Sequence, residues 1–237
     1  DPLRTELARY AQYHLRPRPG TNLAVLNLFA RAILDAGLID QDFITRRTEG
    51  WAAFAAHLQG LDIAAQARIC GVDWDLIQAT ARAYAAAPAA MEFHGLGVTE
   101  HWQGTKAVAL IAAIALMTGN FGKPGAGVNP LRGQNNVQGA ADMGVQPHQG
   151  PGYLAVDDPL VQARYQDFYG VAHFPDQPGY KIPEMFAASN RGELKALWIM
   201  GEDLLRTDPN TCQVRHALSG LEFLVVQELF LTDTAQL

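Results

Sequence analysis

The chain is poor in cysteine and contains no long hydrophobic run. Two of its 237 residues are cysteines, Cys70 and Cys212, and thiols so far apart form neither a zinc motif nor an iron–sulfur motif. We expect two buried free thiols, with a disulfide between them as the alternative. The longest apolar run, Ala107 to Met117, is much shorter than the roughly 20 residues of a membrane-spanning helix. We therefore expect no direct insertion into a membrane.

Positive charge is also scarce. The chain has 18 Lys+Arg against 24 Asp+Glu, a net charge of -6, and only Lys106, Lys123, Lys181 and Lys195 are lysines. Such a chain offers no basic patch for nucleic acid and little attraction to anionic membranes. A content of 49% hydrophobic and 18% charged residues is that of an ordinary globular protein.

The two ends of the sequence predict that the chain is a fragment of a longer protein. The sequence begins at Asp1 without a methionine, and it stops at Leu237 shortly after a strand-like segment, Phe223–Val226. We expect a protein truncated at both ends, so that any export signal would lie upstream of Asp1.

Helix and strand patterns follow one another along the chain. A short strand is expected at 13–15, a helix at 22–36, mostly helical structure over 40–87, a strand at 90–95 and a helix at about 103–118. Near the end, a strand at 194–200, a turn, a helix near 209–219 and a strand at 223–227 form a parallel-sheet unit.

These patterns predict the α/β class, with doubly wound, mainly parallel sheets flanked by helices. We divide the chain into residues 1–90, the mostly helical end of one α/β cofactor-binding domain, and residues 91–237, a second such domain. The second domain would carry a long active-site loop at 119–155.

The most informative segment runs from Met117 to Gly139. Its 23 residues include six glycines, two prolines, four Asn, two Gln and one arginine, Arg132. Glycine lets a backbone approach a ligand closely, amides offer donors and acceptors, and a guanidinium holds an anion with two parallel hydrogen bonds. The segment therefore predicts a ligand-lining loop.

Polar turns also follow the expected strands. Ligands of doubly wound sheets bind at the carboxyl ends of the strands, where Gly95–Glu100, Gly201–Asp203 and Gln227–Thr232 lie. The turn Pro19–Asn22 adds a helix N-terminus, which favours phosphate. Four such turns together suit a large phosphorylated cofactor, although Gly95-Leu96-Gly97 lacks the third glycine of a dinucleotide fingerprint.

The segment Leu116–Gly139, followed by Ala140–Gly144 and Pro151–Tyr153, resembles the catalytic subunit of molybdenum- or tungsten-dependent formate dehydrogenases. The flanking segments Asp1–Thr5, Met200–Asp203 and Val225–Thr232 agree with this resemblance, which covers nearly the whole chain.

The resemblance implies a metal held by two molybdopterin guanine dinucleotides. Arg132, in Asn-Pro-Leu-Arg-Gly-Gln, matches the substrate arginine, and nitrate reductases carry Thr-Gly-Gln there without an arginine. No metal ligand is expected within this chain, and an iron–sulfur cluster is expected only in a missing N-terminal part. The residues expected to bind the cofactor are Asp1, Gly20, Thr21, Asn22, Leu96, Gly97, Glu100, Gly133, Gln134, Gly201, Glu202, Asp203, Gln227 and Thr232.

The sequence departs from the family pattern at two positions. Leu3 stands where many relatives have a second arginine, and Ala141 replaces a frequent Cys. His94, His101 and His148 do not have the spacing of metal ligands. For Arg132 the alternative is a structural arginine that binds loop carbonyls, and for Gly201–Asp203 a simple turn.

The implied activity is oxidation of formate to CO2, or the reverse, in a cytoplasmic assembly with electron-transfer subunits of the iron–sulfur, flavin/NAD or hydrogenase type. Two alternatives stay open. The chain could be a non-catalytic scaffold of the same fold, or a piece of a sister molybdopterin oxidoreductase that acts on another small anion.

Overall fold

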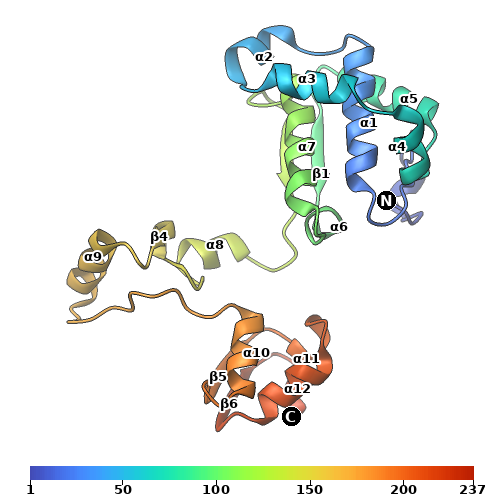
Figure 1. Cartoon of the computed structure of the whole chain (residues 1–237). Helices are drawn as coiled ribbons and strands as arrows, with labels where there is room; N and C mark the ends of the chain where they lie inside the picture. The colour runs from blue at the N-terminus through green and yellow to red at the C-terminus, as the bar shows by residue number, and fades with distance from the viewer. The chain divides into compact units, whose positions relative to one another are not determined.

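The computed structural model describes all 237 residues, which divide into two compact units, Asp1–Asn135 and Asn136–Leu237 (Figure 1). This division differs from the boundary near residue 90 expected from the sequence. The reason is packing: the helix at 104–117 lies against the helix at 22–35, so residues 91–135 join the helical segment before them. The two units are described separately below.

The first unit is mainly helical, as predicted. The expected helix at 22–36 is observed as α1, and the expected helix at 103–118 as α7. The expected strand at 13–15 is wrong, because no other strand pairs with this segment. The helices are η1 (Leu7–Arg9), α1 (Asn22–Asp35), α2 (Gln41–Arg47), α3 (Trp51–Gln59), α4 (Ile63–Cys70), α5 (Trp74–Ala85), α6 (Leu96–Thr99) and α7 (Gly104–Met117).

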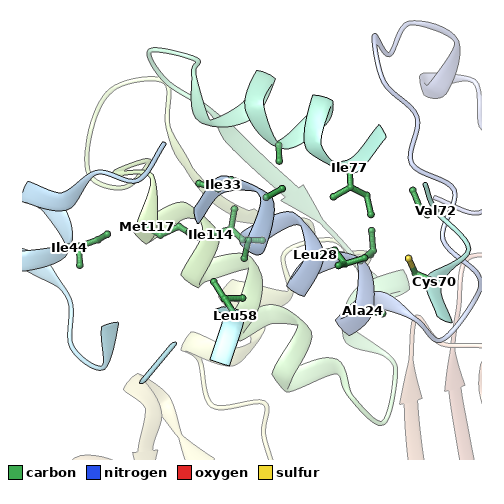
Figure 2. Packing of buried hydrophobic residues seen from close by; sticks show 14 residues of the cluster. Ala24, Leu28, Ile33, Ile44, Leu58, Cys70, Val72, Ile77, Ile114 and Met117 are labelled. Carbon is green, nitrogen blue, oxygen red and sulfur yellow. The ribbon is translucent and has the colours of Figure 1, made fainter. Parts of the chain in front are cut away.

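The core of this unit is built around α1. Leu28 and Ile33 of α1 are fully buried, and α1 contacts α3, α4, α5 and α7. Figure 2 shows Leu58, Ile77 and Ile114 among the side chains of this cluster, which come from three of those helices. Burial of large aliphatic side chains contributes about 1.5–3 kcal/mol each, so this packing holds the helices around α1 together.

Two parallel strands complete the first unit. β1 (Met91–His94) pairs with β2 (Gly127–Pro130), with His94 opposite Pro130. The Leu131 N–H continues the ladder by donating to the His94 carbonyl at 2.7 Å. The Asn129 amide donates to the carbonyls of Glu92 (3.3 Å) and Gly127 (3.1 Å). Because the strands are parallel, the segments that follow them leave the sheet at the same edge.

The second unit is an α/β unit with a second parallel pair. β5 (Ala196–Met200) pairs with β6 (Phe223–Gln227), and β6 has the bounds expected from the sequence. Phe186, Ile199, Val214 and Leu218 are among the buried residues of its core. The remaining elements are α8 (Val137–Asp142), β3 (Gln149–Gly150), η2 (Pro151–Tyr153), β4 (Leu154–Ala155), α9 (Pro159–Tyr169), α10 (Ile182–Asn190), α11 (Leu204–Thr207), α12 (Thr211–Ser219) and η3 (Thr234–Gln236).

The predicted α/β class with parallel sheets is confirmed, and each parallel sheet consists of two strands in this chain. β3 and β4 form a short antiparallel pair within the expected loop at 119–155. Both cysteines are free: Cys70 is buried as expected, whereas Cys212 is exposed on α12, so the expectation for Cys212 is wrong. None of the helices combines the length and apolarity that crossing a membrane requires.

Candidate functional site

The segment after β2 places Arg132 at the carboxyl edge of the first parallel pair. Arg132, Gly133 and Gln134 are exposed, and the side chains of Arg132 and Gln134 form no hydrogen bond or ion pair. The alternative of a structural arginine that binds loop carbonyls therefore has no contact to support it. A guanidinium in this state keeps all its donors available for an anion.

The turn after β1 lies at the same edge and is linked to the turn before α1. Gly95 separates β1 from α6, whose first residue, Leu96, is half exposed, and Glu100 follows α6 and is exposed. The Asn22 amide donates to the Gly97 carbonyl at 3.1 Å. Three of the segments expected to bind the cofactor, 19–22, 95–100 and 132–134, therefore belong to one edge of the first unit.

Several backbones at this edge have open space beside them. A Cβ built at Gly20, Gly97 or Gly133 would have no other atom within 4 Å, and Gly20 has φ +81°, which favours glycine. Thr21 donates its hydroxyl to the Arg18 carbonyl at 2.6 Å and does not cap α1. The Ala24 N–H donates to the Thr21 carbonyl at 3.1 Å, so the N–H groups of Asn22 and Leu23, the first two of α1, are those free to meet a phosphate.

The second parallel pair presents another set of expected cofactor ligands. Gly201, Glu202 and Asp203 follow β5, and the Gly201 N–H donates to the Gln227 carbonyl at 2.9 Å. Gly201 has φ +65° and open space beside it. The side chains of Glu202 and Gln227 form no hydrogen bond, so both remain available to a ligand.

Asp203 and Thr232, by contrast, are engaged within the protein. One Asp203 carboxylate oxygen accepts hydrogen bonds from the backbone N–H (3.0 Å) and the hydroxyl (2.7 Å) of Thr234, which is fully buried. These hydrogen bonds, with a contribution from Arg206, hold the pKa of Asp203 below its usual value. The Thr232 hydroxyl accepts from the Ala235 N–H at 3.3 Å.

Arg206 and Asp233 extend this contact. The Arg206 guanidinium lies 2.9 Å from Asp233 and 3.8 Å from Asp203. The sequence analysis missed Thr234 and Arg206. Asp203 directly precedes the short helix α11, and Arg206 lies three residues further on; this spacing is a weak sequence signal that could have pointed to Arg206.

The expected loop at 119–155 is braced where it enters the second unit. Asn136 has φ 50° and caps α8 by accepting from the Gly139 N–H at 3.1 Å. The Tyr153 hydroxyl donates to Asp142 at 2.7 Å, and the Gln138 amide donates to the Tyr153 hydroxyl at 2.7 Å. Although the expected loop is rich in glycine and amides, its part after Asn135 therefore has a defined structure.

A cavity of about 350 Å³ in the first unit contains chemistry that the sequence analysis did not select. Glu92 accepts a hydrogen bond from the Tyr84 hydroxyl, and burial raises the pKa of Glu92 to about 7. Burial likewise raises the pKa of Tyr84. His94 lines the same cavity, as do Asp1 and Asn22. The alternation of β1, which places Glu92 and His94 on one face, is the sequence signal for this pair.

Comparison with known proteins identifies the class. The family model described as molybdopterin oxidoreductase matches residues 1–237. The chain therefore belongs to the molybdopterin oxidoreductase family. This family implies a molybdopterin cofactor with molybdenum or tungsten, and its activity is that of oxidoreductases.

The similar proteins include formate dehydrogenases. The chain is 42% identical to formate dehydrogenase H of Escherichia coli over 99% of the chain and 33% of that protein. It is also 42% identical to the F420-dependent formate dehydrogenase subunit alpha of Methanocaldococcus jannaschii, over 100% of the chain and 35% of that protein. The chain thus spans about a third of the length of these relatives.

Other members of the family also match, so the substrate is not fixed by similarity. The assimilatory nitrate reductase catalytic subunit of Bacillus subtilis is 34% identical over 100% of the chain and 33% of that protein. The solved structure of acetylene hydratase from Pelobacter acetylenicus matches with a TM-score of 0.71 at 20% identity, covering 100% of this chain and 35% of that one. This structural likeness shows the fold alone.

Proposed function

We propose that this chain is part of a formate dehydrogenase that oxidises formate to CO2, or catalyses the reverse reaction, and that Arg132 binds the substrate. The observation that carries this proposal is the exposed, unpaired guanidinium of Arg132 directly after β2. The sequence identity of 42% to each of two formate dehydrogenases supports this proposal.

The chemistry of Arg132 suits formate. Formate is a small planar carboxylate, and a guanidinium can hold its two oxygens with two charge-assisted hydrogen bonds. The Leu131–His94 hydrogen bond and the Asn129 amide fix the backbone that leads to Arg132. In this proposal Arg132 orients the C–H bond of formate and stabilises the anion in the site, while the metal and pterins supply the redox chemistry.

The proposed cofactor is the bis(molybdopterin guanine dinucleotide) form. The open backbones at Gly20, Gly97 and Gly133, and the uncapped N-terminus of α1, fit a phosphate-containing group. In the second unit, Gly201 offers open space beside its backbone, and Glu202 and Gln227 offer side chains without partners. Asp203 and Thr232 would act by holding the segment beside them. The other proposed contacts are Asp1, Thr21, Asn22, Leu96, Glu100 and Gln134.

Partners and location follow from the proposed activity. Electrons from formate must leave the site, so we propose electron-transfer subunits of the iron–sulfur, flavin/NAD or hydrogenase type, in the cytoplasm. An iron–sulfur cluster would be held outside the 237 residues of this chain, because its two cysteines make no cluster motif.

The proposal is tested on the native full-length protein purified from the cells that produce it. Molybdenum and tungsten per polypeptide are counted by mass spectrometry, and formate-dependent reduction of a viologen dye is then measured. A near-stoichiometric metal content with formate activity is the expected result. Metal without formate activity would overturn the substrate assignment, and absence of metal would favour a non-catalytic scaffold.

A second candidate function is reduction of another small anion, because a nitrate reductase is also a relative. The same preparation is assayed with nitrate and reduced viologen. Nitrate turnover that exceeds formate turnover would favour this candidate, and Arg132 would then have a different anion as its partner.

A further inference from the structure

Asn120, shortly after α7, is a buried polar residue that joins two distant segments. The residue is only 1% exposed. Its side-chain Oδ1 accepts a hydrogen bond from the Ala90 N–H at 3.0 Å, and its Nδ2 donates to the Thr118 hydroxyl at 3.0 Å. A buried amide needs partners for both its oxygen and its nitrogen, and Ala90 and Thr118 supply them. Asn120 therefore links the end of α7 to the residue before β1.

The end of α7 does not need this side chain as a cap. The last carbonyls of a helix have no partner within the helix. In α7 these carbonyls, of residues 114–117, accept hydrogen bonds from the Thr118 hydroxyl and from the backbone N–H groups of Asp40, Gly119 and Asn120. The contact between the Asn120 side chain and Ala90 therefore serves the strand and not the helix.

The turn that carries Asn120 is held firmly to the core of the first unit. Gly119 has φ +63°, and a Cβ at this position would lie 2.4 Å from the Oδ2 of Asp40, so glycine allows a close approach that other residues do not. Ile114 and Met117, labelled in Figure 2, are buried in the cluster around α1. Asn120 thus has a fixed position from which it holds Ala90.

Ala90 in turn binds both ends of the loop 121–126. Its N–H donates to the Asn120 side chain, and its carbonyl accepts from the N–H of Gly127, the first residue of β2, at 3.3 Å. The exposed residues of this loop are Phe121, Gly122, Pro124 and Gly125. Because most of the loop lacks buried contacts, the starting point of β2 depends on Ala90.

The strand β2 itself carries little information on how it pairs with β1. Its sequence is Gly-Val-Asn-Pro, and none of its residues is buried. Register is weakly specified in glycine-rich strands without a buried face. A slip of one residue would move Arg132 by about 3.3 Å along the sheet and would reverse the faces of the side chains of β2. The Asn129 amide, which donates to the Glu92 carbonyl at 3.3 Å, lies within the pair and strengthens a register that is already set.

We propose that Asn120 is a positioning residue that, through Ala90, fixes the register of β2 against β1 and thereby places Arg132 in the substrate site. The hydrogen bond from the Leu131 N–H to the His94 carbonyl carries this register to the residue before Arg132. The inference rests on the proposed role of Arg132 in binding formate. A substrate-positioning group displaced by about 1 Å can lower a rate by about 100-fold, so a slipped register would matter for activity.

The main test compares three variants of the full-length protein. Asn120→Ala removes the acceptor of the Ala90 N–H, whereas Asn120→Asp keeps an oxygen at the same place. Ile77→Val is the matched control, because it weakens the same core at a residue of α5 that does not contact this turn. Thermal unfolding of each variant records its loss of stability.

Hydrogen exchange measures the register directly. The N–H groups of Gly127 and Leu131 donate to the carbonyls of Ala90 and His94, and mass spectrometry follows their exchange. In Asn120→Ala both should exchange about tenfold faster than in the wild type. Asn120→Asp should restore slow exchange although it is less stable, and Ile77→Val should keep it. Unchanged exchange in Asn120→Ala, or equally fast exchange in Ile77→Val, would overturn the proposal.

Steady-state kinetics test the consequence for Arg132. The KM for formate should rise about tenfold in Asn120→Ala with a smaller change in kcat, and Asn120→Asp should recover most of this loss. Faster exchange without a change in KM would overturn the link to Arg132. If the wild type does not oxidise formate, the proposed function fails, and the exchange rates alone decide whether Asn120 fixes the register.

A longer loop provides a test that leaves the core intact. One glycine is inserted between Phe121 and Gly122, which are both exposed. If Asn120 and Ala90 hold the two ends of the loop, the insertion enlarges only the loop, and both the exchange of Gly127 and the KM for formate stay at their wild-type values. A faster exchange or a raised KM would show that loop length sets the register and would overturn the proposal, even if Asn120→Ala fails to fold.

Discussion

The two parallel strand pairs of this chain follow one sequence pattern but use their polar residues differently. After β1 and β2, the side chains of Glu100, Arg132 and Gln134 are exposed and have no hydrogen-bond partners. After β5 and β6, Asp203 is bound to Thr234 and accompanied by Arg206. A polar residue after a strand is therefore either free for a ligand or used to hold the next segment.

This difference has a physical origin in the segment that must be held. Thr234 is fully buried, so its N–H and hydroxyl need partners, and Asp203 supplies an acceptor to both. Arg132 leads into no comparable buried polar group, and its guanidinium stays in solvent. The predictions below test whether Arg132 after the first pair binds a ligand and whether Asp203 after the second pair holds its neighbouring segment.

Removal of the Arg132 guanidinium should have the largest effect. Arg132→Ala loses the fork that holds formate, and kcat/KM for formate should fall by about 100-fold or more, roughly 3 kcal/mol of transition-state stabilisation. Steady-state kinetics of the full-length protein check this. Arg215→Ala, an exposed arginine on α12, is the control and should retain activity. A loss below threefold in Arg132→Ala would remove Arg132 from the substrate site.

The buried carboxyl of Glu92 should make the first unit sensitive to pH. Its pKa is about 7 in the folded chain against 4.5 ordinarily, so the unfolded chain releases this proton first as the pH rises. The free energy of unfolding should fall between about pH 4.5 and 7 by roughly 2 kcal/mol, after allowance for partial solvent exposure. Glu92→Gln should remove this slope.

Urea denaturation at pH 5 and pH 8 measures the slope, and Glu100→Gln provides an exposed control. The same loss of stability in the wild type and in Glu92→Gln would show that Glu92 is not the group that titrates.

Thr234→Val should destabilise the second unit by about 1–2 kcal/mol, because it removes a buried hydroxyl that donates to Asp203 at 2.7 Å. Thermal unfolding of the chain measures the change. The contribution of Asp203 itself should be present above the ordinary carboxyl pKa and lost at lower pH, since its folded pKa is lowered. A stability of Thr234→Val equal to that of the wild type would contradict a bracing role for Asp203.

The smallest effect is expected for Asn22→Ala. The amide of Asn22 forms one exposed hydrogen bond with the Gly97 carbonyl at 3.1 Å, and its loss should cost about 0.5–1 kcal/mol. The turn before α1 and the turn after β1 would then be joined less firmly, so cofactor retention should fall as well. Metal content after gel filtration measures this, with Asn27→Ala on α1 as the control. Full retention in Asn22→Ala would show that this link does not support the cofactor site.

Local patterns predicted the helices and several strands. The segment from Asn22 to Ala36 is apolar on one face and ends before Gly37, which has φ +67°, and α1 occupies it. β6 is a continuous apolar run between polar turns. β2 was missed, because Gly127 and Pro130 do not favour a strand locally and the strand forms by pairing with β1.

The candidate site could be predicted only where a residue carries a family motif. Arg132 and its neighbours were found in this way, and their roles stay predictions. Sequence could not show that Asp203 is held by Thr234, because these residues are distant in the chain and meet only in the fold. It also could not show the cavity of Glu92 and His94, which depends on side chains from α1, α5 and α7.

The two free thiols give the chain a built-in reporter of its own motions. Cys212 is exposed and can react with an alkylating reagent in the native state, whereas Cys70 is fully buried in the cluster around α1. Cys70 reacts only when that cluster opens. Its rate of alkylation relative to that of Cys212 therefore measures how often the core of the first unit opens transiently. A ligand that tightens this unit would slow the Cys70 reaction while leaving that of Cys212 unchanged.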